Sequence, residues 1–78
     1  MTNMPNLDIE YNVQAINSLE KSCSLNDGMG CGRLGRLYVK GLGVKQNKKI
    51  SKEYYGKACD LGLQEGCDEY RKLNEQGY

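Results

Sequence analysis

The chain has 78 residues, a net charge of +1, four cysteines, six tyrosines and no histidine, phenylalanine or tryptophan. This length suffices for one small domain, whose core often needs cross-links or a partner. The near-neutral charge gives no general attraction to nucleic acid or membranes, and the lack of histidine excludes imidazole catalysis and histidine-ligated metals. No apolar run in the sequence is long enough to span a membrane.

The N-terminal part of the chain is expected to hold a leader and a first helix. Residues 1–7 are polar, contain the only proline and lack a secretory signal pattern, so we expect a flexible leader. A helix is expected from Asp8, as its N-cap, to about Leu25, because apolar residues recur three or four positions apart. The members of this apolar stripe are Ile9, Val13, Ala15, Ile16, Leu19 and Cys23.

A second helix is expected at residues 28–40, after a turn in which Asp27 is the candidate cap. Its apolar stripe consists of Cys31, Leu34, Leu37 and Tyr38. Gly35 lies on the same side, and a glycine inside a helix costs about 1 kcal/mol relative to alanine. We therefore expect the backbone of a neighbouring helix to approach Gly35 closely. Gly41 is expected to end the helix, and Val44 to pack back into the core.

Two further helices are expected at residues 48–61 and 64–76. Asn47 is the candidate cap of the third helix, and Gly62 and Gly77 are expected to end the third and fourth. The residues expected to face inward are Ile50, Tyr54, Tyr55, Ala58 and Cys59, and then Cys67, Tyr70 and Leu73. The short turns favour antiparallel helix pairs, and no strand pattern is present. The fold class is therefore predicted to be all-α.

The cysteines form two pairs with the same internal spacing, Cys23 with Cys31 and Cys59 with Cys67, and the pairs lie 36 positions apart. A fixed period in the thirties indicates a helical repeat. Other residues recur at this spacing, namely Lys21 and Lys57, Leu25 and Leu61, Gly30 and Gly66, Leu37 and Leu73, and Gly41 and Gly77. The sequence thus predicts a short α-α superhelix, a solenoid of about two antiparallel helix pairs.

The state of the cysteines follows from their number and spacing. Four cysteines in so short a chain favour two disulfides, Cys23–Cys31 and Cys59–Cys67, in an oxidising compartment. Buried thiols are the alternative. Zinc is disfavoured because seven residues separate each pair, whereas zinc ligand pairs usually enclose about two to four. Disulfides would indicate a periplasmic or secreted protein and free thiols a cytoplasmic one. We predict no metal or cofactor.

Several segments resemble a known family. Residues 31–38, CGRLGRLY, and 41–44, GLGV, resemble the first helix and following turn of the Sel1-like repeat, a TPR-like helix pair. Residues 53–61, EYYGKACDL, resemble that repeat's second helix, and the cysteine spacing is similar to that of the Helicobacter cysteine-rich proteins. The resemblance implies a domain at 8–78, with a half repeat, one full repeat at 28–61 and a capping half repeat. It also implies a disulfide between neighbouring helices of each unit.

The charges are unevenly distributed. Between residues 28 and 52 there are seven basic residues and no acidic one. Arg33, Arg36 and Lys40 share one helix face because they lie three and four positions apart. The resemblance implies that this face lines the concave side of the array, where Glu69 and Lys72 follow one period later. We expect these five residues to bind a protein or peptide with acidic groups.

The expected function is that of a non-enzymatic interaction module, including a small inhibitor or immunity-type protein. Nucleic acid is less favoured because the tyrosines fall mostly on core stripes; self-association is a further alternative. Some cysteine-rich relatives are described as penicillin-binding proteins or β-lactamases, which is the alternative function. Ser18 and Lys21 match the S-x-x-K pattern of serine β-lactamases, but S-D-N and K-T-G are absent, so no catalytic residue is predicted.

Overall fold

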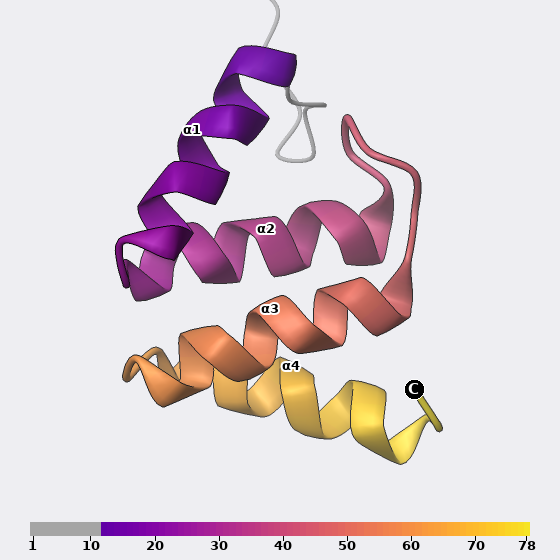
Figure 1. The fold of residues 1–78 in the computed structure, drawn as a ribbon. Coiled ribbons are helices and arrows are strands. Elements are labelled where there is room, and N and C mark those ends of the chain that lie inside the picture. The colour runs from indigo at the N-terminus through magenta and orange to yellow at the C-terminus, as the bar shows by residue number, and fades with distance from the viewer. Residues whose placement is uncertain (1–11) are drawn as a thin grey trace, which may run out of the picture.

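The protein is described here by a computed structural model over residues 12–78, which form four α-helices and no strand. The helices are α1 (Val13–Ser24), α2 (Gly28–Lys40), α3 (Lys48–Asp60) and α4 (Gln64–Glu75). Helices α2, α3 and α4 lie side by side and the chain reverses direction between them, whereas α1 stands steeply against α2 (Figure 1). The all-α class is confirmed, with consecutive helices packed against each other.

Three helices begin at a side chain that satisfies a free amide of the first turn. The Oδ1 atoms of Asn12, Asp27 and Asn47 accept hydrogen bonds from the amides of Ala15, Met29 and Ile50 at 2.8, 3.1 and 3.0 Å. The predicted caps Asp27 and Asn47 are thus confirmed. The expected start of the first helix is wrong, because Asn12 has extended backbone angles and α1 begins at Val13. The predicted cap Asp8 lies outside the described residues.

Three helices are followed, within two residues, by a glycine with left-handed backbone angles. Gly41 (φ 75°) ends α2, and its amide donates to the Leu37 carbonyl oxygen at 2.7 Å. Gly62 (φ 96°) follows α3 and Gly77 (φ 97°) follows α4. Such angles are strained for residues with a Cβ atom, so these three glycines terminate helices as predicted.

The core lies where α2 meets α1 and α3. Its buried members are Ile16, Cys23, Cys31, Leu34, Leu37 and Ala58. Val44 packs against this cluster from the α2–α3 loop, as predicted. Val13 and Tyr70 were expected to face inward, but they are 71% and 39% exposed. The N-terminal end of α1 points away from α2 (Figure 1), so among the described helices none covers a helix-spaced apolar residue at that end.

The reason for a glycine at position 35 differs from the expected one. A Cβ atom on Gly35 would lie 2.8–2.9 Å from three ring carbons of Tyr55, so the close neighbour is an aromatic ring of α3 and not a backbone. The Ser51 hydroxyl of α3 also donates to the Gly35 carbonyl oxygen at 2.6 Å, and Ser51 is fully buried. Gly35 therefore lets α3 seat both side chains directly against α2.

Backbones do approach closely at two other glycines. A Cβ atom on Gly66 would lie 2.7 Å from both the Cys59 nitrogen and the Tyr55 oxygen of α3. A Cβ atom on Gly30 would lie 3.2 Å from the Cys23 nitrogen and 3.3 Å from the Leu19 oxygen of α1, and 2.8 Å from the Ser22 Cβ atom. Both glycines immediately precede the second cysteine of a cysteine pair, so they let the two helices come close enough for a disulfide to form.

Both predicted disulfides are present. Cys23 is bonded to Cys31 and Cys59 to Cys67, with Cα–Cα distances of 4.7 and 4.6 Å. Each bond joins the last turn of one helix to the first turn of the next. The Cys23–Cys31 disulfide is buried in the core, with its two residues 2% and 0% exposed. Cys59 and Cys67 are both partly exposed. Each helix–turn–helix unit therefore carries a covalent cross-link beside its turn.

The helices formed by residues 12–78 are all too short or too polar to cross a lipid bilayer.

Candidate protein-binding groove

A hollow of about 420 Å³ opens between α2 and the start of α4. We call it the α2–α4 groove. Its lining residues are Met29, Gly32, Arg33, Arg36 and Leu37 from α2, Leu63 from the α3–α4 turn and Glu65 from α4. This volume is within the range of about 300–1,000 Å³ that is typical of ligand sites in proteins.

The periodicity of α2 explains which of its residues face the groove. Met29, Arg33 and Arg36 lie four and three positions apart, so they project from one face, while Leu34 and Leu37 are buried against the core. Gly32 lies on the groove face without a side chain, and a Cβ atom there would be 2.6 Å from the Leu63 Cδ2 atom. Leu63 can therefore lie over the α2 backbone and give the groove an apolar floor.

The two walls of the groove differ in charge. The α2 wall carries Arg33 and Arg36, and the α4 wall carries Glu65 in its first turn, where a negative charge interacts favourably with the helix dipole. Burial raises the pKa of Tyr55, which lies near both walls; Glu69 and Glu65 raise this pKa further, whereas Arg36 lowers it. Tyr55 therefore stays neutral at physiological pH and supports the groove as a packing residue.

The predicted partner-binding residues are only partly brought together. Arg33 and Arg36 line the groove, but Lys40, one turn further along α2, does not. Glu69 and Lys72 of α4 also lie outside the lining and pair with each other at 3.3 Å. The charged face predicted from the sequence is thus represented in the groove by the two arginines.

Five of the seven lining residues were not predicted to belong to a binding site, namely Met29, Gly32, Leu37, Leu63 and Glu65. Met29 is 53% exposed, Leu63 is partly buried and Glu65 is exposed. Met29 precedes Arg33 by four positions, so the helical spacing that grouped the basic residues could also have found Met29. No sequence signal identified Leu63 or Glu65, because they join the groove only through the packing of α4 beside α2.

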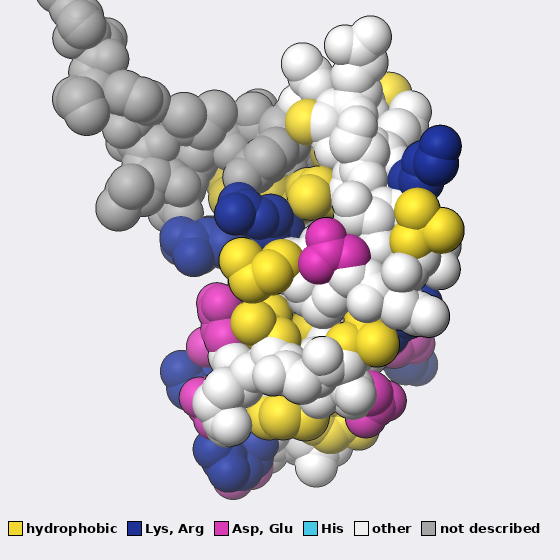
Figure 2. All heavy atoms as spheres, turned by 90° about the vertical axis from the view of Figure 1, so that its left-hand side faces the viewer, with side chains coloured by type: hydrophobic (Ala, Val, Ile, Leu, Met, Phe, Trp, Pro, Cys, Tyr) yellow, Lys and Arg dark blue, Asp and Glu magenta, His cyan; other side chains and the backbone are white. Residues whose placement is uncertain are grey.

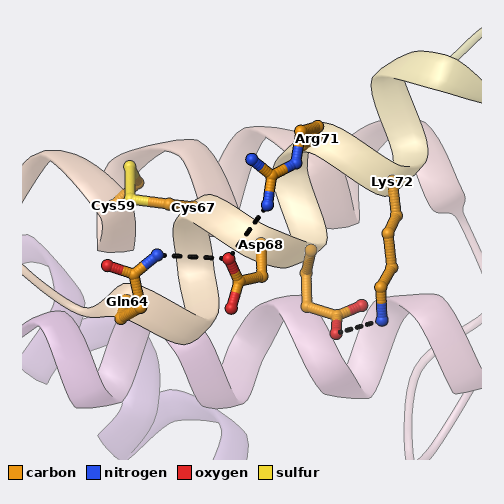
Figure 3. Close-up of polar contacts among 7 residues, drawn as sticks. Cys59, Gln64, Cys67, Asp68, Arg71 and Lys72 are labelled. Carbon is orange, nitrogen blue, oxygen red and sulfur yellow. Dashed lines mark hydrogen bonds and ion pairs between the residues drawn. A yellow bond between two sulfur atoms is a disulfide. The ribbon is translucent and has the colours of Figure 1, made fainter.

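The solvent side of α4 carries a local polar network (Figure 3). An Asp68 carboxylate oxygen accepts hydrogen bonds from the Gln64 side-chain nitrogen at 3.1 Å and from the Arg71 guanidinium at 3.2 Å. These groups lie three or four positions apart on one exposed helix, where such pairs contribute only about 0.3–0.5 kcal/mol each. The network keeps α4 hydrophilic on its outer surface and does not form a reactive site.

The end of the molecule beside the groove exposes apolar side chains. Figure 2 views this end, at which the α1–α2 and α3–α4 turns lie, and shows hydrophobic side chains close to both basic and acidic ones. Leu25 is 70% and Leu61 36% exposed, at equivalent positions of the two turns. A Cβ atom on Gly28 would lie 3.3 Å from the Leu61 Cβ atom, so the start of α2 contacts the end of α3.

The residues of the S-x-x-K match lie on the surface of α1. Ser18 and Lys21 are both exposed on α1, and neither lines the hollow described above. Over residues 12–78, no three His, Cys, Asp or Glu side chains are grouped in a way that could hold a metal ion. Within residues 12–78, Ser18 thus lies on an exposed helix face and outside the α2–α4 groove.

We predict that the purified protein does not hydrolyse the chromogenic β-lactam nitrocefin above the rate of buffer alone. A serine nucleophile of this kind needs a neighbouring base and oxyanion donors, whereas Ser18 lies on an exposed helix face. The measurement is the absorbance change with the wild type and with Ser18→Ala at equal concentration. Turnover by the wild type that is lost in Ser18→Ala would contradict this prediction and favour the enzymatic alternative.

Comparison with known proteins gives one relative and no family. No family model matches the chain, and no solved structure matches it. The chain is similar to an uncharacterized protein of Haemophilus influenzae, with 52% identity over 33 residues, which is 42% of this chain and 64% of that protein. The chain thus matches less than two thirds of the relative's length, and the relative carries no described activity.

Proposed function

We propose that this protein is a non-enzymatic helical module that binds a protein or peptide segment in the α2–α4 groove. The observation that carries the proposal is the groove itself, with its apolar floor and its basic α2 wall. Ligand sites are typically concave, largely apolar and furnished with a few polar groups that orient the ligand. The groove has this composition, whereas the S-x-x-K pair lies on an exposed helix face.

The rigidity of the scaffold supports binding as well. Two disulfides fix the turns that join α1 to α2 and α3 to α4. The second of these turns supplies Leu63 to the floor of the groove. A preformed site loses less conformational entropy when a ligand binds. A cross-linked helical scaffold is therefore suited to presenting one fixed surface to a partner.

The partner proposed from the charges is a protein or peptide with acidic groups, bound by Arg33 and Arg36 and by the neighbouring Lys40. A small inhibitor or immunity-type role fits a chain that offers one compact surface. We also propose that the helices form the Sel1-like, TPR-like repeat predicted from the motifs, and that the disulfides form in the periplasm or outside the cell. Nucleic acid is disfavoured, and self-association is an alternative use of the same surface.

The test is a pairwise affinity measurement with a groove variant. A partner captured from extracts of the source cells is purified, and its affinity is measured by calorimetry. We expect Met29→Asp to weaken binding by about tenfold or more, since it places a charge at an apolar contact of the groove. Met29 is exposed, so the variant should fold, which circular dichroism checks.

The matched control is Leu25→Asp, which makes the same kind of change at an exposed residue outside the groove lining. We expect it to bind like the wild type. If Met29→Asp and Leu25→Asp both bind with wild-type affinity, the groove is not the binding site and the proposal is wrong.

A further inference from the structure

We infer that the α2–α4 groove takes an extended segment of another protein, in which an apolar residue stands two or three positions from an acidic one. This inference rests on the proposed function and adds the chemistry and the spacing of the segment that binds. It follows from three properties of the groove: the place of its apolar floor, the place of its arginines and its size.

The apolar residue of the partner belongs at the turn end of the groove. Met29 lies in the first turn of α2, and Leu63 lies directly before the first turn of α4. Both line the hollow. Burial of a partner side chain between Met29 and Leu63 would remove exposed apolar surface on both molecules, which favours association.

The acidic residue belongs further along α2. Arg33 follows Met29 by four residues and Arg36 by seven, which corresponds to about 6 and 10 Å along a helix axis that rises about 1.5 Å per residue. Arg33 is exposed, and its planar guanidinium suits a bidentate contact with a carboxylate. A partner carboxylate is therefore expected about 6–10 Å from the apolar residue.

The α4 wall determines which way the acidic residue faces. Glu65 lines the groove on that side and would repel a carboxylate. Beyond Glu65, the Glu69 carboxylate is already paired with Lys72 at 3.3 Å (Figure 3). An acidic side chain of the partner is thus attracted by the α2 wall and not by the α4 wall, which gives the bound segment a fixed orientation.

The size of the groove favours an extended ligand over a helical one. A helix with its side chains is about 10–12 Å wide, so an open hollow of about 420 Å³ would hold only part of its width. An extended chain advances about 3.3 Å per residue, so two to three residues span the 6–10 Å between the apolar floor and the arginines. A helical ligand would instead need a spacing of four to seven residues.

The first experiment is a selection from random twelve-residue peptides displayed on phage, with the oxidised wild-type protein as bait. We expect enrichment of peptides in which a large apolar residue lies two or three positions from Asp or Glu. The best peptide is then labelled and titrated by fluorescence anisotropy. Moving its acidic residue next to the apolar one, or five positions away, should weaken binding by about tenfold.

The second experiment changes the receptor. Arg33→Glu should weaken the binding of the acidic peptide by about tenfold and strengthen the binding of a version of it with Lys in place of the acidic residue. Lys49→Glu is the matched control, because it makes the same charge change at an exposed position of α3 outside the groove lining. We expect Lys49→Glu to bind the acidic peptide within about twofold of the wild type, as is usual for charges outside the contact.

The outcomes separate the inference from the proposed function. The inference would be wrong if the enriched peptides lack acidic residues, if their apolar and acidic residues lie four or seven positions apart, or if Arg33→Glu does not change their affinity. In each of these cases, loss of peptide binding in Met29→Asp would still support a groove-binding module. If no peptide is enriched and Met29→Asp leaves the affinity for the captured partner unchanged, the inference and the proposed function both fail.

Discussion

Reduction of both disulfides is expected to lower the midpoint of thermal unfolding by about 20 °C or more, because 1 kcal/mol shifts the midpoint of so small a domain by about 4–8 °C. Each bond closes a loop of about nine residues, which stabilises by about 2–3 kcal/mol on the chain-entropy model. The sum of about 5 kcal/mol is comparable with the whole stability of a small domain, about 0.05–0.15 kcal/mol per residue. Few residues other than the cysteines are fully buried between α1 and α2, so the core offers little compensation.

The measurement is thermal unfolding followed by circular dichroism, with and without a phosphine reductant. A variant with serine at all four cysteine positions is the control for effects of the reductant itself: it has no disulfide in either condition, so the reductant should leave its midpoint unchanged. An unchanged midpoint in the reduced protein would show that the cysteines act only as packing residues.

Gly66→Ala is expected to destabilise the protein by about 2 kcal/mol, which is in the range for overpacked sites. The added methyl group would lie 2.7 Å from the Cys59 nitrogen and from the Tyr55 oxygen, both backbone atoms of α3. These atoms cannot move without separating α3 from α4, and the Cys59–Cys67 disulfide resists that separation. The helix-propensity gain of alanine over glycine, about 1 kcal/mol, only partly offsets this cost.

Gly32→Ala is the matched control, since it makes the same change inside α2. There the methyl group would meet the Leu63 Cδ2 atom, the end of a flexible side chain that can shift. We expect Gly32→Ala to remain within about 1 kcal/mol of the wild type, because its propensity gain balances a small repacking cost. Urea denaturation measures both variants, and equal stabilities would contradict the role assigned to Gly66.

Local signals in the sequence predicted most of the helix boundaries. Asp27, Asn47 and Gly41 act within one turn of their own position, so their effect does not depend on the rest of the fold. The start of α1 was misplaced because Asp8 and Asn12 are both good caps, and the apolar pattern continues across both. Periodicity alone could not decide which of the two begins the helix.

Errors in the predicted core arose where the outcome depends on neighbouring helices. An apolar stripe gives the face of a helix but not whether another helix covers it, and Tyr70 is exposed because α4 packs mainly against α3. Gly35 was assigned a backbone neighbour for the same reason. A glycine on a packed face predicts a close contact, but only the fold shows that the contact is the ring of Tyr55.

The groove could be predicted only in part. Arg33 and Arg36 were found because the helical period places them on one face of α2. Leu63 and Glu65 were not, because 26 or more residues separate them from Leu37 and only the packing of α4 brings them near. The sequence therefore indicated the charge of the site but not its apolar floor, which comes from tertiary structure.

The bond between Cys23 and Cys31 is closed off from solvent, so an oxidant cannot reach it once the surrounding residues have packed. It must form before or while α1 closes on α2 during biosynthesis. Cys59 and Cys67 remain partly accessible, so their bond can form late and can exchange with external thiols in the mature protein. The disulfide of the N-terminal helix pair is thus protected once it has formed, whereas the disulfide of the C-terminal pair can still be reduced or exchanged.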